Sequence, residues 1–254
     1  MTGFVLRLIA CFTMLIDHIG LVFNEDLAMI HPLVPVVCRI IGRIAFPLFA
    51  FGIAEGATHT SSPGKYVLRM FIFALISQLP FMLMLGTHSA DITINLFSHQ
   101  IGLGRECSVM VTLLFGLIIC TSIHEGRHFY AALALGAAYL VDKLIGMDYG
   151  ILGVLFIAAL YLSRQSKVGR SLVMVLFCVC FYFVDIYGLA KQIFGPGTPV
   201  ITARIIRFFA MCVPAVLILF YNGKRGLKAK AFTYSFYPVH MLVLWVIWAA
   251  VNIF

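Results

Sequence analysis

The sequence predicts an all-α protein, a polytopic transmembrane helix bundle of about nine spans with a cytoplasmic N-terminus. Two features of the composition lead to this fold class: 62% of the 254 residues are hydrophobic, and only 11% are charged. A soluble domain carries about 25% charged residues, so this chain lacks the polar side chains that would cover a water-exposed surface. The third observation is the recurrence of apolar runs close to the roughly 20 residues that cross a bilayer.

The apolar runs follow one another along the whole chain, which is therefore expected to form a single integral membrane domain over residues 1–254. A β-barrel is disfavoured because its strands would appear as short alternating segments. The short runs 129–146 and 149–163 are also compatible with one hairpin or a partly re-entrant segment. The predicted spans are 4–24, 33–57, 66–86, 108–123, 129–146, 149–163, 171–190, 201–221 and 231–253.

The basic residues of the connections support this topology. With the N-terminus inside, 11 Lys and Arg residues fall on the cytoplasmic side and 3 on the outer side, while the remaining 4 of the 18 lie in or at the ends of spans. This bias follows the positive-inside rule and indicates a multi-pass protein of the bacterial cytoplasmic (inner) membrane. The net charge of +8 therefore does not call for a nucleic-acid partner. The cytoplasmic set is Arg7, Lys65, Arg69, Arg127, Arg164, Lys167, Arg170, Lys224, Arg225, Lys228 and Lys230.

The sequence lacks several common motifs of catalysis and binding. The seven cysteines lie mostly inside apolar runs and show no metal-ligand spacing, so no metal site is expected. No Gly-rich phosphate loop or nucleophile elbow occurs. The longest connection, 87–107, is expected on the outer side.

Several ionisable residues lie within the predicted spans, where an unpaired charge costs several kcal/mol. Asp17 and His18 are deep in the first span, and Arg39 and Arg43 are at i and i+4 on one face of the second. His18 lies about 21 Å from the inner surface, near the expected level of the two arginines. These four residues are the candidate catalytic group. Plainer interpretations remain open: a packed core histidine, arginines that pair helices, and an aspartate that holds either His18 or an arginine.

Four stretches, spread from the first span to the last, carry a family resemblance. They are Ile16–Gly20, Gly42–Phe51, Asp148–Gly153 and Tyr237–His240, and the second contains the specific block Gly-Arg-x-Ala-Phe-Pro. Together they resemble the TraX family, named for the F-pilin acetylase, over nearly the whole chain.

A second, weaker resemblance is to the membrane acyltransferase-3 group. Its hallmark in the first span is a basic residue, ten others and then a histidine, and Arg7 and His18 fit that spacing. Its two signature arginines are separated by two residues, whereas Arg39 and Arg43 are separated by three.

The resemblance implies an acetyltransferase that uses cytoplasmic acetyl-CoA as co-substrate. His18 would be the general base, Asp17 would orient it or tune its surroundings, and Arg43 with Arg39 would stabilise the oxyanion or bind the acceptor. The acceptor would be a peptide N-terminal amine, in a pilin-like or secreted peptide, with a surface carbohydrate hydroxyl as the alternative. The residues expected on the acetyl-CoA side are Arg7, Lys65, Arg69, Tyr149 and His240.

Two other classes of function fit the same sequence features. In a transporter or flippase, buried charges would line a translocation path. In an assembly factor for a surface appendage, they would have a structural role only.

Overall fold

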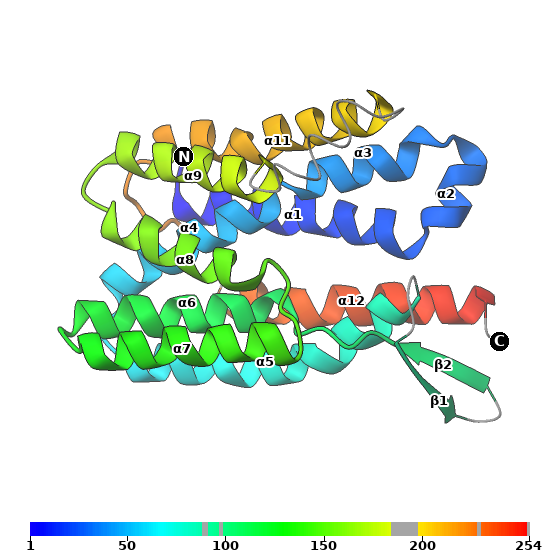
Figure 1. Cartoon of the computed structure of the whole chain (residues 1–254), viewed down its shortest axis with the longest axis horizontal. Coiled ribbons are helices and arrows are strands. Elements are labelled where there is room, and N and C mark those ends of the chain that lie inside the picture. Colours follow the sequence, from blue (N-terminus) through cyan, green and yellow to red (C-terminus); the bar gives the residue numbers. More distant parts are fainter. Residues whose placement is uncertain (88–90, 97–98, 184–197, 228–229, 253–254) are drawn as a thin grey trace.

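The computed structural model describes residues 1–87, 91–96, 99–183, 198–227 and 230–252. Its helices run roughly along the longest dimension of the molecule, and the N-terminus and the C-terminal end of the last helix lie at opposite ends (Figure 1). The helices are α1 (Gly3–Val22), α2 (Asn24–Ile30), α3 (Leu33–Gly42), α4 (Ala45–His59), α5 (Pro63–Gly86), α6 (Val109–His124), α7 (His128–Leu144), α8 (Gly150–Leu162), α9 (Lys167–Phe183), α11 (Thr198–Leu219) and α12 (Lys230–Asn252).

A helix overlaps each predicted range, which confirms the all-α class. Residues 184–190 of the seventh predicted span and residue 253 of the ninth lie outside the described residues. By length and composition, four of the described helical stretches are able to cross a membrane: Gly3–Val22, Leu33–His59, Pro63–Gly86 and Phe232–Asn252. Val109–His124, Gly150–Leu162 and Ile205–Leu219 are shorter apolar helices. The protein is therefore a helical membrane protein, while the count of nine spans and the cytoplasmic N-terminus stay predictions.

The connections predicted on the cytoplasmic side gather at one end of the bundle, beside the N-terminus (Figure 1). The Met1 ammonium donates to the carbonyl oxygen of Phe220 at 2.5 Å, and the Gly3 amide donates to that of Lys224 at 2.9 Å. The start of α1 is thereby tied to the loop after α11. We call this the basic end, because the loops and adjoining helix ends there carry most of the described Lys and Arg residues.

The opposite end carries two elements that the sequence analysis did not predict. Helix α2 follows α1 directly, and the connection 87–107 contains an antiparallel ribbon of β1 (Ile92–Leu96) and β2 (His99–Leu103). The Gly104 amide, just after β2, donates to the carbonyl oxygen of Met82 in α5 at 2.9 Å. Five-residue strands give too few alternations to stand out in such an apolar sequence. We call this end of the bundle the ribbon end.

The second predicted span, 33–57, is not one continuous helix: α3 ends at Gly42 and α4 begins at Ala45. Pro47 explains the break, since a proline removes the hydrogen bond to the carbonyl four residues earlier, here that of Arg43, and its ring clashes with that carbonyl. The Arg43 and Ile44 amides instead bond to carbonyls three residues back, at 3.2 Å each. The sequence block Gly42–Pro47 therefore produces a kink with Arg43 at its centre.

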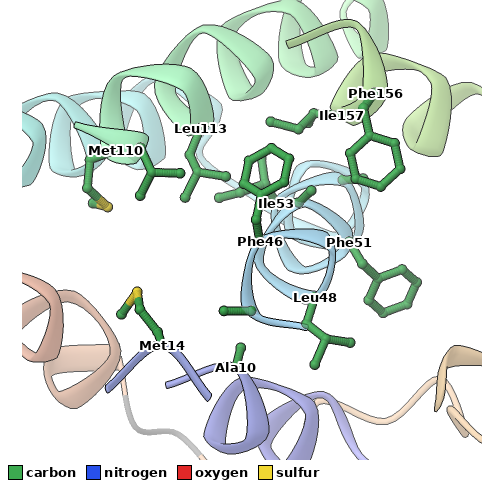
Figure 2. Close-up of a cluster of buried hydrophobic side chains, with 14 of the residues drawn as sticks. Ala10, Met14, Phe46, Leu48, Phe51, Ile53, Met110, Leu113, Phe156 and Ile157 are labelled. Atoms are coloured by element: carbon green, nitrogen blue, oxygen red, sulfur yellow. The ribbon is translucent and has the colours of Figure 1, made fainter. Parts of the chain in front are cut away.

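Helix α4 lies inside the bundle and packs against α1, α6 and α8. Its side chains Phe46, Leu48, Phe51 and Ile53 are buried. Figure 2 shows α4 between α1, which carries Ala10 and Met14, and the two helices α6, with Met110 and Leu113, and α8, with Phe156 and Ile157. Tight packing and small residues hold membrane helices together because lipid supplies no hydrophobic driving force between them. This central position fixes the kink at Arg43 within the bundle.

Candidate active site

An ion-pair cluster joins α1 to the kink between α3 and α4. The Asp17 carboxylate is 2.5 Å from Arg39 Nη1 and 3.5 Å from Arg43 Nη2. Arg43 Nε also donates to the Arg39 carbonyl at 3.1 Å, which fixes its orientation. Two guanidiniums and one carboxylate leave this cluster with a net charge of +1. Of the two open readings of Asp17, the structure therefore shows the one in which it holds arginines.

Glycines allow α1 and α3 to approach closely around this cluster. A Cβ atom built on Gly42 would overlap the Asp17 carboxylate, and one built on Gly20 would overlap the Cys38 Cβ. Small residues that let backbones approach are typical of helix contacts in membranes. Gly42, next to Arg43 in the same sequence block, thus makes room for the carboxylate that pairs the arginines.

His18 contacts a residue from the other end of the chain rather than Asp17. Its Nδ1 lies 2.7 Å from Nε2 of His240 in α12. The Nδ1 of His240 lies 2.6 Å from the carbonyl oxygen of Phe236, one turn earlier in the same helix. Both histidines are buried, with 9% and 6% of their surface exposed. This pair of imidazoles was not predicted.

A cavity of about 330 Å³ opens at the ribbon end, and we call it the outer cavity. It brings together all four predicted catalytic residues. Its walls also include two carboxylates that the sequence analysis did not select, Glu106 and Asp148. The lining of the outer cavity includes Asp17, His18, Arg39, Arg43, Asp148 and Tyr149.

The connection between α7 and α8 supplies Asp148 and Tyr149. Tyr149 has a positive φ of 64°, which is uncommon for a residue other than glycine and is often found at functional sites. Its ring stacks on that of Phe46, with centroids 3.8 Å apart, and Thr112 Oγ1 donates to the Asp148 carbonyl at 2.5 Å. Burial raises the pKa of the Asp148 carboxyl to about 6, although the Arg43 guanidinium opposes that rise. Two of the four stretches that carry the family resemblance, Gly42–Phe51 and Asp148–Gly153, thus meet at the outer cavity.

A larger cavity of about 490 Å³ opens at the basic end, and we call it the inner cavity. Arg7 and Arg69 line it together with the phenol rings of Tyr66 and Tyr234. The Nε atoms of both arginines are buried and have no hydrogen-bond partner among the described residues. Guanidiniums with unused donors are suited to bind phosphate groups.

A second ion pair closes one wall of the inner cavity. Glu55 of α4 accepts hydrogen bonds from Arg170 of α9 at 2.6 Å and from the Tyr221 hydroxyl at 3.2 Å. Arg170 is among the basic residues predicted for the cytoplasmic connections. Its partner lies 115 residues away, and no local spacing could have indicated the pair.

The two cavities approach each other on one face of α1. Met14 lines the inner cavity, and His18, one helical turn further along, lines the outer cavity. Tyr237 of α12 also lines the inner cavity, and its ring centroid is 6.4 Å from that of His18. Only about one turn of helix, roughly 6 Å, therefore separates the two cavities along α1.

The structure does not bring the residues predicted on the acetyl-CoA side together at one site. Arg7 and Arg69 line the inner cavity, and Lys65 is exposed at the basic end outside that lining. Tyr149 lines the outer cavity, and His240 contacts His18. Among the described residues, no group of three His, Cys, Asp or Glu side chains is placed to hold a metal ion.

The chain is similar to known proteins over nearly its whole length. The family model described as TraX protein matches residues 3–248. The chain is 26% identical over 255 residues to a protein of Dichelobacter nodosus named "Probable fimbrial assembly protein FimC, serogroup H1", with 96% of this chain and 94% of that protein covered. No solved structure matches.

Proposed function

The chain belongs to the TraX family, and from that premise we propose that it is a membrane-embedded acetyltransferase that uses acetyl-CoA as acetyl donor. One observation carries the proposal: His18 lies in the wall of the outer cavity, one helical turn from the inner cavity. Two cavities that open at opposite ends and approach one buried histidine suit a reaction whose donor and acceptor arrive from different sides of the membrane.

The inner cavity is the proposed binding site for acetyl-CoA. Arg7 and Arg69 offer guanidinium donors to its phosphates, and the apolar stretch toward Met14 and Tyr237 accommodates its thin arm. When bound there, acetyl-CoA supplies an acetyl group on a thioester carbonyl. Because the basic end carries the residues predicted to be cytoplasmic, the donor would enter from the cytoplasm.

The outer cavity is the proposed site for the acceptor. The acceptor ammonium first loses one proton to solvent. His18 then removes a second proton from the neutral amine as the amine nitrogen attacks the thioester carbonyl. The new nitrogen–carbon bond forms, the carbon–sulfur bond breaks, and His18 returns the proton to the leaving thiolate. The net positive charge of the Asp17, Arg39 and Arg43 cluster stabilises the developing oxyanion.

A peptide N-terminal amine is the proposed acceptor, in a pilin-like or secreted peptide. The similarity to a fimbrial assembly protein supports a pilin-related substrate. Glu106 and Asp148 in the outer cavity also suit a cationic group, because carboxylates attract an ammonium more than a neutral hydroxyl. A surface carbohydrate hydroxyl is the alternative acceptor.

The proposal is tested with purified protein in lipid nanodiscs and acetyl-CoA labelled in the acetyl group. We expect release or transfer of the label by the wild type and a loss of at least about a hundredfold in His18→Ala, as for removal of a general base. His124→Ala is the matched control, because His124 also bonds to a ring partner, Tyr161 at 2.9 Å, away from both cavities. Equal activity of His18→Ala and the wild type would refute the proposal.

A transporter or flippase is the second candidate, favoured by the same pair of cavities opening at opposite ends. It predicts movement of a solute or lipid across proteoliposomes without any cleavage of acetyl-CoA. The labelled assay separates the two functions, since only the acetyltransferase yields free thiol.

A further inference from the structure

We propose that His240 is a positioning residue that fixes the tautomer of His18, so that Nε2 of His18 is the basic atom. The catalytic part of this inference rests on the proposed function. The tautomer of His18 does not, because it is a property of the resting protein. It assigns to His240 a role different from the acetyl-CoA contact that the sequence analysis expected.

A backbone carbonyl fixes the tautomer of His240. The Phe236 oxygen can only accept a hydrogen bond, so Nδ1 of His240, 2.6 Å away, must carry the hydrogen. A neutral imidazole has one N–H group and one lone pair, and Nε2 of His240 is therefore an acceptor. The ring is held in this orientation by the Phe236 ring, which lies nearly parallel at a centroid distance of 4.7 Å.

The lone pair of His240 in turn fixes the position of the proton on His18. Its Nδ1 lies 2.7 Å from Nε2 of His240, and that acceptor requires a donor, so Nδ1 of His18 carries the hydrogen. The two ring planes differ by only 4°, with centroids 4.9 Å apart. Atoms in stacked rings stay about 3.5 Å apart or more, so the short nitrogen–nitrogen distance means that the rings meet edge to edge. This places the lone pair of His240 in the plane of the His18 N–H, the favourable geometry.

The remaining ring nitrogen of His18, Nε2, is thereby left with its lone pair. It has no hydrogen-bond partner among the described residues, and His18 lines the outer cavity. Both imidazoles are neutral in the resting protein, because their burial and the net positive arginine cluster disfavour an added charge.

The same contact supports the protonated state of His18. When Nε2 takes a proton from the acceptor, the Nδ1–H of His18 becomes a stronger donor to His240, which spreads the new charge. Catalytic histidines are commonly oriented by a carboxylate. Here the neighbouring carboxylate, Asp17, is engaged by Arg39 and Arg43, and a neutral histidine takes the orienting position.

The tautomer is tested directly by nitrogen-15 NMR of protein in nanodiscs labelled at histidine. Signals are assigned by their loss in His18→Gln and His240→Gln. We expect His18 to show a protonated Nδ1 and an unprotonated Nε2, and His240 the same. A protonated Nε2 on His18 in the resting wild type would overturn the inference, whether or not the protein transfers acetyl groups.

Activity supplies a second test through a conservative pair of variants. The amide oxygen of Gln at position 240 can still accept from His18, whereas Leu cannot. We expect His240→Leu to lower kcat by about 10- to 100-fold, as for loss of other orienting partners, and His240→Gln to retain most of kcat. Thermal unfolding of both variants controls for folding. Equal losses in two equally folded variants would overturn the positioning role, whereas an inactive wild type would refute only the proposed function.

Discussion

Asp17 and Arg39 form an ion pair of 2.5 Å between α1 and α3, while His18, the next residue after Asp17, points to a different partner in α12. Consecutive residues of a helix do not share a face, so the two side chains perform separate tasks. Asp17 neutralises part of the arginine cluster, and His18 faces the outer cavity. We therefore expect substitutions of Asp17 and of His18 to have different effects on the protein.

Asp17→Asn is expected to destabilise the protein more than it alters His18. Removing the carboxylate leaves Arg39 and Arg43 partly buried without their counter-charge, and a lost hydrogen bond to a charged group costs about 1.5–3 kcal/mol. Thermal unfolding in detergent should show a lower Tm, and Arg39→Gln in the same chain should recover part of the loss. Histidine NMR should show an unchanged His18 tautomer; a changed one would mean that Asp17 orients His18 after all.

Gly42→Ala is expected to separate α1 from α3. Its new Cβ would overlap the Asp17 carboxylate, and overpacking of this kind costs about 1–3 kcal/mol. Gly52→Ala in α4 is the matched control, since no atom lies within 4 Å of the Cβ position there. The control should unfold at the wild-type temperature or higher, because alanine favours a helix by about 0.5–1 kcal/mol over glycine. Equal Tm values for the two variants would contradict this packing.

The grouping of Asp17 with Arg39 and Arg43 could be predicted because it depends on local quantities, namely helical spacing and depth along two neighbouring spans. The contact between His18 and His240 could not, because it joins residues 222 positions apart and depends on which faces of the first and last helices pack together. Hydropathy locates membrane helices but leaves their rotation and neighbours open. Asp148 was not selected for a related reason: it lies in a connection, and its place in the outer cavity depends on packing against residues distant in the sequence.

Asp148 gives the protein a pH-dependent stability that can be measured. The pKa of this carboxyl is raised from 3.8 to about 6 in the folded state, so the folded state holds its proton more tightly than the unfolded chain does. The resulting stabilisation is complete below about pH 4 and is lost as the pH rises through 6. Asp148→Asn cannot ionise, so its Tm should improve relative to the wild type between pH 4 and pH 7. A difference in Tm that stays constant across that interval would show that Asp148 ionises normally.

Arg69→Gln is expected to weaken the binding of acetyl-CoA without slowing the chemical step. Arg69 lines the inner cavity with a buried Nε that lacks a described partner, and it is not part of the lining of the outer cavity where His18 acts. Loss of one charge-assisted hydrogen bond to a phosphate, about 1.5–3 kcal/mol, corresponds to a 10- to 100-fold rise in KM for acetyl-CoA with kcat nearly unchanged. Arg127→Gln is the matched control, because Arg127 lies at the same end, pairs with Glu125 at 3.3 Å and lies outside the inner cavity lining. If both variants raised KM equally, the effect would come from the general positive charge of the basic end, and the inner cavity would lose its assignment as the phosphate site.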